Sequence, residues 1–394
     1  MNVCFVANDV APSGAFKMVA PELERRGIKT TGLVAEGKPP KFSKGDIDSA
    51  ISKSDLVVLG MSAPAKNAEL EIYAAKKAHE LGVPYSFYGD VAGCWGRAQE
   101  GNWFYPVARN TAFYFGVRDE DGVKDVFPNA HIFATGNPVR ETEAFPVMSR
   151  EEARKVLGVK NDEKLIMVPG SKFVGANFSI LAVLFEALDF LHSDKIRLIF
   201  CPHPGDTEIF AVDWRKILKI YEDSKTQLLN VLSSFDQLFA VLNKVFNDSE
   251  LAKLQLNAYQ EFLDSSPVPA RVITKDILSS AQAVNGADLV VEYGSSVAFM
   301  AVYRRIPLLT LPVIAAANRC KKNNGKRETE VMEDEVTIVA SADNCLNLSE
   351  DIEFLLIPNS EDAEDLLASQ EKKYPLPKER GEAVRKLADA ITSL

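Results

Sequence analysis

The chain has 394 residues, of which 46% are hydrophobic and 25% charged, and its formal net charge is −10. This composition is typical of a globular protein long enough for two domains, each with its own core. The negative charge argues against a general nucleic-acid or anionic-membrane binder. The sequence has no signal-peptide pattern at its start and no apolar run that could span a bilayer, and its five cysteines are scattered. We therefore expect a cytoplasmic protein with reduced thiols.

The first part of the chain alternates apolar segments with amphipathic ones. Strands are expected at residues 2–7, 29–34, 55–60, 84–88, 111–115 and 131–135. Helices are expected at 15–26, after a polar turn at 8–14, and at 68–81. Such strand–helix–strand units predict a parallel sheet with right-handed crossovers. The first loop lacks G-x-G-x-x-G, and G-x-x-x-x-G-K-[ST] is absent, which argues against a dinucleotide fingerprint and a P-loop.

Ligands of parallel sheets bind beyond the carboxyl ends of the strands, so the loops there hold the candidate site residues. In the first half these loops span 9–14, 61–67 and 89–97. Asp90 and Asp9 are the candidate general bases, because each carboxylate follows a strand. A solvated turn aspartate is an equal alternative for Asp90. The other polar or flexible candidates, which we assign to the acceptor side, are Ser13, Gly14, Ser62 and Arg97.

A turn at residues 136–140 ends the first series, and Ser149-x-x-Glu152 predicts a capping box at the next helix. We expect an N-terminal domain at 1–139, a C-terminal domain at 140–374, and a terminal segment at 375–394 whose helix packs back on the first domain. Strands of the second domain are expected at 164–168, 197–201, 271–274, 289–291, 306–311 and 335–340. Both halves are therefore Rossmann-like α/β domains.

Three loops of the second half are suited to a phosphate. Gly170-Ser171-Lys172 offers a flexible turn, a hydroxyl and a cation, and the elbow Gly294-Ser295-Ser296 precedes a helix. His203 lies between two prolines at a strand end and can donate to a phosphate or a sugar hydroxyl. Helix capping by the serines and a rigid turn at His203 are the alternatives. The four histidines show no metal-ligand spacing, so neither a metal nor another cofactor is expected.

Residues 213–265 interrupt the alternation with an apolar, helical pattern. Simple packing against the second domain explains such a segment. A homodimer surface and a peripheral membrane contact that receives a lipid-linked acceptor are the alternatives.

Several segments together carry a resemblance to a known superfamily. Thr135–Pro138 (TGNP) resembles the interdomain segment of N-acetylglucosaminyl transferases, and residues 202–204 (PHP) resemble the HP loop of polymer-forming glycosyl and glycerophosphate transferases. Residues 165–172 resemble the first strand and loop of the second domain of these enzymes, and residues 287–312 resemble the segment that holds the donor diphosphate. Residues 55–90 resemble the corresponding part of nucleotide-sugar 2-epimerases. The chain thus resembles GT-B glycosyltransferases and their 2-epimerase relatives, of the polysaccharide type.

This resemblance implies two Rossmann-like parallel-sheet domains that face each other across a cleft. It implies a glycosyltransferase that moves a sugar from a nucleotide-diphosphate donor to a carbohydrate or lipid-linked acceptor hydroxyl, in glycan or cell-envelope biosynthesis, without nucleic acid as a partner. Ala301 takes the place of the usual ribose-binding glutamate, and Glu292 is the carboxylate nearest to the elbow. The resemblance therefore does not identify the nucleotide. A 2-epimerase, a glycerophosphate transferase and a non-catalytic scaffold are the alternative functions.

Overall fold

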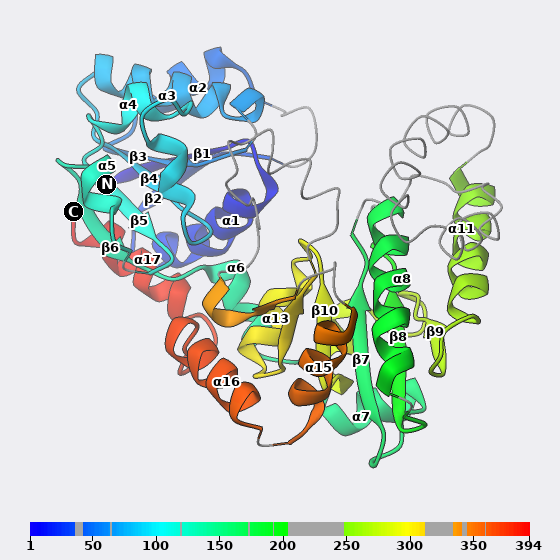
Figure 1. Cartoon of the computed structure of the whole chain (residues 1–394). Helices are drawn as coiled ribbons and strands as arrows, with labels where there is room; N and C mark the ends of the chain where they lie inside the picture. Colours follow the sequence, from blue (N-terminus) through cyan, green and yellow to red (C-terminus); the bar gives the residue numbers. More distant parts are fainter. Residues whose placement is uncertain are drawn as a thin grey trace. The chain divides into compact units, whose positions relative to one another are not determined.

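In the computed structural model the chain forms two compact units, Met1–Phe145 with Pro377–Leu394, and Pro146–Leu376. The structure describes residues 1–35, 42–63, 65–118, 120–171, 174–191, 193–203, 248–311, 334–340, 345–358 and 360–394. The units divide after Phe145 and after Leu376, a few residues beyond the divisions at 139/140 and 374/375 that the sequence predicted. Each unit is an α/β unit built on one sheet (Figure 1).

The sheet of the first unit has six strands in the order β2-β1-β3-β4-β5-β6, and all neighbouring strands are parallel. Their bounds are β1 Asn2–Ala7, β2 Lys29–Val34, β3 Leu56–Gly60, β4 Tyr85–Tyr88, β5 Phe113–Gly116 and β6 His131–Ala134. β3 and β4 are buried along their whole length, whereas the edge strand β2 is largely exposed. The parallel sheet predicted from the alternating pattern is confirmed.

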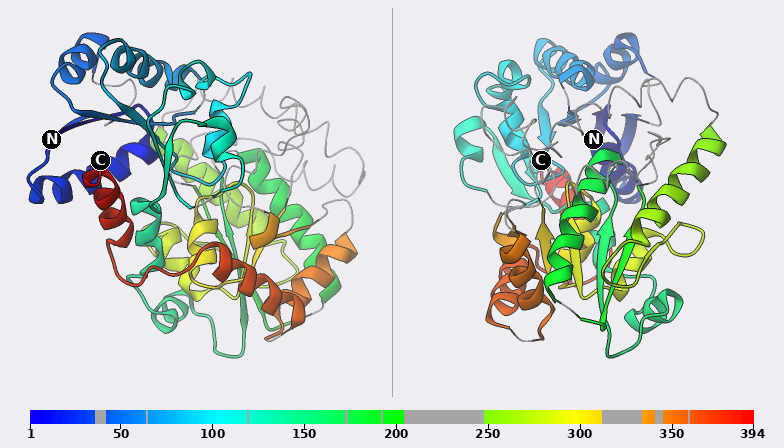
Figure 2. Two further views of the ribbon diagram at one scale, coloured as in Figure 1. Left: turned by 90° about the vertical axis from the view of Figure 1, so that its left-hand side faces the viewer. Right: turned by 45° about the vertical axis from the view of Figure 1, so that its right-hand side comes forward.

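The helices of the first unit are α1 Val10–Arg25, α2 Lys44–Ile51, α3 Glu69–Glu80, α4 Tyr105–Ala108, α5 Val123–Val126, α6 Pro138–Glu141 and α17 Glu382–Thr392. Short 3-10 turns cover Ala65–Asn67, Cys94–Ala98 and Thr142–Ala144. The last helix, α17, packs beside α1 (Figure 2), and its Leu387 and Ile391 share a buried cluster with Phe16. The Glu141 carboxylate accepts the N–H groups of Glu382 (2.8 Å) and Ala383, which fixes the start of α17.

The predicted polar turn at residues 8–14 is wrong, because α1 begins at Val10. The Asp9 side chain accepts the Val10 N–H at the start of the helix, and Pro12 is tolerated there because the first turn needs no N–H from it. Gly14 is helical as well, and a Cβ on it would lie 3.0 Å from Cγ2 of Val139. The glycine therefore reflects close packing and not a turn. Helix α2 was not expected from the sequence.

The sheet of the second unit has the order β12-β11-β10-β7-β8-β9, again with parallel neighbours. Its strands are β7 Lys164–Pro169, β8 Ile196–Cys201, β9 Ala270–Val272, β10 Leu289–Glu292, β11 Leu308–Thr310 and β12 Ile338–Val339. The strand expected at 335–340 is mostly wrong: Asp334–Val336 forms a 3-10 turn and only two residues pair with β11. The two-faced burial predicted for residues 289–291 is confirmed.

The helices of this unit are α7 Arg150–Leu157, α8 Val174–Leu191, α11 Asp248–Leu263, α12 Ser280–Ala283, α13 Val297–Tyr303, α15 Cys345–Leu356 and α16 Glu361–Lys373, with a 3-10 turn at Val284–Gly286. The capping box predicted at Ser149 and Glu152 starts α7. One face of the sheet, including Ile166 and Phe200, packs against α8, α11 and α15. No described helix combines the length and the hydropathy needed to cross a membrane.

Most of the apolar segment at 213–265 lies outside the described residues, which resume at Asp248 with α11. The end of α11 packs into the core of the second unit. Tyr259 is fully buried and stacks on Phe178 with 4.8 Å between ring centroids, and Phe262 is 1% exposed. This part of the segment is therefore a helix of the core, and for these residues the predicted packing against the second domain is confirmed.

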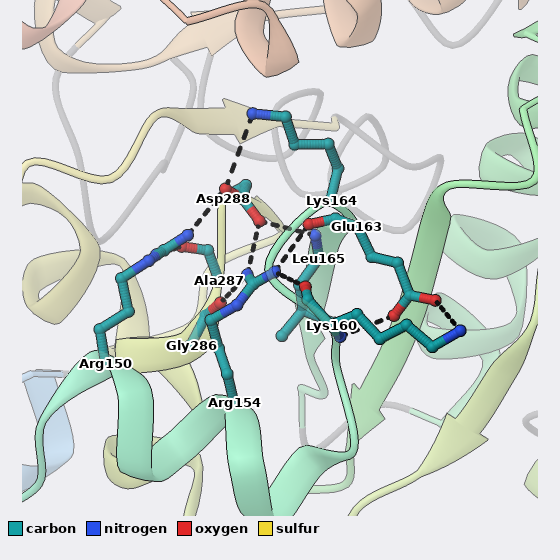
Figure 3. A network of polar contacts seen from close by, with 9 residues as sticks. All are labelled: Arg150, Arg154, Lys160, Glu163, Lys164, Leu165, Gly286, Ala287 and Asp288. Carbon is teal, nitrogen blue, oxygen red and sulfur yellow. Dashed lines mark hydrogen bonds and ion pairs between the residues drawn. The ribbon is translucent and has the colours of Figure 1, made fainter.

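A network of charged groups joins the amino ends of β7 and β10 (Figure 3). Arg154, which is 6% exposed, donates to the backbone oxygens of Gly286, Lys160 and Glu163 and to Asp288. Asp288 also accepts the Leu165 N–H at 2.8 Å. The guanidinium therefore satisfies several acceptors that would otherwise be buried without partners. A cavity of about 720 Å³ opens at this same edge, between the α7–β7 loop, the end of α8 and the segment before β9.

Candidate functional site

The strand orders locate one switch point in each sheet. In the first sheet the chain runs outward from β1 to β2 on one side and from β3 to β6 on the other. In the second sheet it runs outward from β7 to β9 and from β10 to β12. Parallel α/β sheets bind ligands at the carboxyl end of the sheet where the two directions diverge. The candidate site loops are therefore those after β1 and β3 in the first unit and those after β7 and β10 in the second.

A buried carboxyl group occupies the switch point of the first sheet. Glu71 of α3 is fully buried, and its Oε1 accepts the Asn8 N–H (3.1 Å) and the Ser62 hydroxyl (2.6 Å). Its Oε2 accepts the Ser62 N–H at 3.1 Å. A Cβ on Gly60 would lie 2.8 Å from Glu71 Oε1, so a glycine is needed where β3 ends. Glu71 thus ties the loop after β1 to the loop after β3.

Burial raises the pKa of Glu71 from 4.5 to about 7. The donors from Ser62 and Asn8 oppose this rise, and the nearby charge of Asp9 adds to it. The sequence analysis did not single out Glu71. Its position in the sequence could have indicated its burial, because Glu71 lies on the same helix face as the buried alanines Ala74 and Ala78.

Asp90 follows β4 and is 6% exposed. The Cys94 thiol donates to its Oδ1 at 3.8 Å, and the Asn137 amide donates to its backbone oxygen. Burial raises the pKa of Asp90, Arg97 lowers it most among the charged neighbours, and Asp9 raises it. The structure therefore brings the two predicted bases and Arg97 to the carboxyl edge of one sheet. A buried carboxyl group with a raised pKa is typical of a general base.

The remaining acceptor-side candidates hold these loops in place. The Ser13 hydroxyl donates to the backbone oxygen of Asp9 at 2.5 Å and accepts the Ala35 N–H at 3.0 Å. The Arg97 guanidinium donates to the Met61 oxygen in the loop after β3. Ser13 thus joins the start of α1 to the segment after β2, and Arg97 joins the segment after β4 to the loop after β3.

In the second sheet the loop after β7 is tightly packed. The Gly170 N–H donates to the Cys201 oxygen at 2.8 Å, and a Cβ on Gly170 would lie 3.0 Å from the His203 nitrogen. Ser171 is buried, and its N–H and oxygen both bond to the Asn177 side chain, at 2.7 and 3.0 Å. His203 is exposed just after β8. Thus Gly170, Ser171 and His203 lie together at the carboxyl edge of this sheet, while Lys172 lies outside the described residues.

The elbow after β10 has the backbone that its sequence predicts. Gly294 has φ +65°, a conformation that favours glycine, and Ser296 is exposed. Ser295 is 5% exposed, and its hydroxyl accepts the Val297 N–H at 3.4 Å. Its own N–H donates to Oε2 of Glu292 at 2.8 Å. The loop that was predicted to bind a phosphate is therefore bonded to a carboxyl group of the same chain.

Glu292 is 2% exposed at the end of β10, and its Oε1 accepts the Thr310 hydroxyl at 2.9 Å. Burial raises its pKa from 4.5 to about 7, against the donors from Ser295, Thr310 and Gly294. Its side chain lies inside the unit, where it organises the elbow. Both switch points thus contain a buried glutamate that accepts backbone N–H groups of the flanking loops.

Two other kinds of candidate site, a cavity and a metal-binding cluster, were sought among the described residues. The cavity of about 720 Å³ lies at the amino edge of the second sheet, where Glu163 pairs with Arg197 at 2.5 Å and Asp162 pairs with Lys195 at 3.6 Å. Within the described ranges, no group of three or more histidine, cysteine or acidic side chains is arranged to hold a metal ion.

Comparison with known proteins identifies the fold. No protein-family model matches the sequence, and the curated proteins give no match. Among solved structures, MurG of Acinetobacter baumannii is similar at 13% identity and a TM-score of 0.55, over 100% of this chain and 99% of that one. The UDP-GlcNAc 2-epimerase of Methanocaldococcus jannaschii is similar at 13% identity and a TM-score of 0.52, over 100% of both chains.

The UDP-GlcNAc 2-epimerase of Neisseria meningitidis, solved with UDP-GlcNAc bound, matches at 11% identity and a TM-score of 0.51, over 100% of both chains. With its two six-stranded parallel sheets, this chain has the GT-B fold. The fold class predicted from the sequence is confirmed.

Proposed function

We propose that this protein is an enzyme that uses a nucleotide-diphosphate sugar and transfers the sugar to an acceptor hydroxyl in glycan or cell-envelope biosynthesis. The observation that carries the proposal is the convergence of Gly170, Ser171, His203 and the Gly294–Ser296 elbow on the switch-point edge of the second sheet. A GT-B neighbour with UDP-GlcNAc bound is consistent with such a ligand.

In this proposal the second unit binds the diphosphate. Charge builds on the nucleotide diphosphate as the sugar leaves, and fixed donors stabilise that charge without reorganisation. The exposed His203 and Ser296 and the N–H groups of the elbow are the donors that we assign to it. Lys172, which the sequence placed in the same set, keeps its predicted role as a cation for the phosphate.

In the first unit, Asp90 is the proposed general base for the acceptor hydroxyl. Its raised pKa and its position after β4 fit that role, because a base works best when its pKa approaches the working pH. Asp9 is the alternative, and its side chain accepts the Val10 N–H at 2.8 Å. Carbohydrate and lipid-linked acceptors both remain part of the proposal.

Binding is tested first, with a panel of nucleoside diphosphates and nucleotide sugars followed by calorimetry. We expect micromolar to millimolar affinity for at least one diphosphate, because the KM values of enzymes cluster in that range. Absence of binding by every member of the panel would reject the proposal.

The reaction is tested next by incubating the protein with the bound nucleotide sugar, with and without an acceptor mixture. Transfer releases nucleoside diphosphate in an acceptor-dependent manner. Two of the similar structures are UDP-GlcNAc 2-epimerases, which makes 2-epimerisation the second candidate reaction. That reaction would convert the sugar into its 2-epimer without any acceptor, and NMR of the product mixture distinguishes the two.

A further inference from the structure

We propose that Glu292 is a proton-linked gate of the diphosphate site: its carboxylate holds the Ser295 N–H before the ligand binds, and anion binding at the elbow is coupled to uptake of one proton by this carboxyl group. The inference rests on the proposed function and adds a regulation of the same site by pH. The step adds a solvent proton to a carboxylate oxygen and makes or breaks no other covalent bond.

The first argument is competition for a single donor. The Ser295 N–H is 2.8 Å from Glu292 Oε2, which is a full hydrogen bond. A phosphate oxygen that takes this N–H must weaken or replace that bond, because one hydrogen serves one strong acceptor. The carboxylate cannot turn to solvent easily, since Glu292 is 2% exposed. It must therefore stay beside the bound anion.

The second argument is electrostatic. Two anions a few ångströms apart in a buried environment disfavour each other, and protonation of the carboxyl group removes the repulsion. Burial already raises the pKa of Glu292 to about 7, so a complex that contains only the protonated form loses about tenfold in affinity at pH 8, one unit above that pKa. Ligand binding and proton binding at this position are then linked.

Among the described elements packed against β10, no side chain supplies a counter-charge that would hold Glu292 ionised. Strand β10 packs against β7, β11, α13 and α15. The titratable or charged side chains of these elements are Lys164, Tyr303, Cys345, Glu350, Asp351 and Glu353. None of these is among the groups that shift the pKa of Glu292, which are the Ser295 and Gly294 N–H groups and the Thr310 hydroxyl.

The third argument is that the hydroxyl chain behind Glu292 satisfies both protonation states. Thr310 Oγ1 lies 2.9 Å from Glu292 Oε1 and 2.9 Å from Thr337 Oγ1, and Thr337 can donate to the Leu308 oxygen at 3.1 Å. When Glu292 is ionised, Thr310 donates to it. When Glu292 is protonated, its O–H donates to Thr310, Thr310 donates to Thr337, and Thr337 donates to Leu308. Hydroxyl groups rotate freely enough to make this exchange.

The test is calorimetry of UDP binding to the full-length protein at pH 7.5–8.5, in buffers of small and large ionisation heat. The second pKa of a phosphate group is near 6, so free UDP is almost fully deprotonated in this pH range and contributes few of the protons that are exchanged on binding. We expect uptake approaching one proton per UDP, with Kd rising about tenfold per pH unit. UDP binding without proton uptake would overturn the gate and leave the proposed function intact. Failure of all nucleoside diphosphates to bind would instead reject the function, and the gate with it.

Two variants test whether Glu292, and not another group, takes up the proton when UDP binds. Glu292→Gln cannot take up the proton, so we expect no uptake, a Kd independent of pH, and UDP binding at pH 8 about tenfold tighter than wild type. Glu71→Gln is the matched control, because Glu71 is equally buried with the same raised pKa but belongs to the other sheet. It should keep the uptake. Loss of uptake in Glu71→Gln and its retention in Glu292→Gln would refute the assignment.

Discussion

The buried Glu71 makes the stability of the protein depend on pH in a direction opposite to that of most carboxylates. The unfolded chain releases this proton near pH 4.5, whereas the folded chain releases it near pH 7. Between these values the folded state binds more protons than the unfolded state, so the free energy of unfolding falls as the pH rises. The stabilisation is complete below about pH 4.5 and is lost by about pH 7.

The size of the effect follows from the two pKa values. A shift from 4.5 to about 7 corresponds to about 3 kcal/mol, at 1.36 kcal/mol per pH unit. Glu71→Gln removes this dependence, although an amide accepts fewer of the Asn8 and Ser62 hydrogen bonds, which lowers its stability by about 1–3 kcal/mol at every pH. The diagnostic quantity is therefore the change of the stability difference with pH.

Urea unfolding of wild type and Glu71→Gln at intervals from pH 4.5 to 8 measures that quantity. We expect the variant to gain about 3 kcal/mol relative to wild type across this range. The contribution of Glu292 is common to both proteins and cancels. Parallel curves of unfolding free energy against pH would show that Glu71 has an ordinary pKa, and that the argument from its burial is wrong.

Three further predictions concern the site and the amino-edge network. Asp90→Asn should slow transfer by about 10²–10⁴-fold with UDP affinity unchanged, in single-turnover and binding assays; normal turnover would remove Asp90 as the base. His203→Ala and Ser296→Ala, which remove the two exposed side-chain donors assigned to the diphosphate, should each weaken UDP binding by about 1–3 kcal/mol by calorimetry, and unchanged affinity in both would place the ligand elsewhere. Arg154→Met should destabilise by about 3–5 kcal/mol in urea, against less than about 1 kcal/mol for the half-exposed Arg150→Met, and equal losses would contradict the role of burial.

Features that depend on a few neighbouring residues were predictable from the sequence. The capping box of Ser149 and Glu152 uses four consecutive residues, and the strand at 289–291 shows its burial as an uninterrupted apolar run. The alternation of such runs with amphipathic segments led to both parallel sheets. The left-handed conformation of Gly294 likewise follows from its place in a tight elbow.

Features that depend on distant residues were missed or misread. Gly14 looks like a turn residue, but its reason is the contact with Val139, which lies far along the chain. The burial of Glu71 depends on Asn8 and Ser62, which come from two separate loops. A helical pattern alone cannot show that a glutamate on an apolar face has such partners. The strand order that defines the switch points is also a property of pairing and not of any local segment.

The membership of α17 in the first unit has a consequence for the order of events during synthesis. Leu387, Ala388 and Ile391 complete the buried cluster around Phe5 and Phe16. These side chains leave the ribosome only after residues 146–376 have been made, so the first unit keeps an apolar surface uncovered until the chain is released. A nascent chain that stops before α17 should therefore leave this surface of the first unit open to chaperones and proteases.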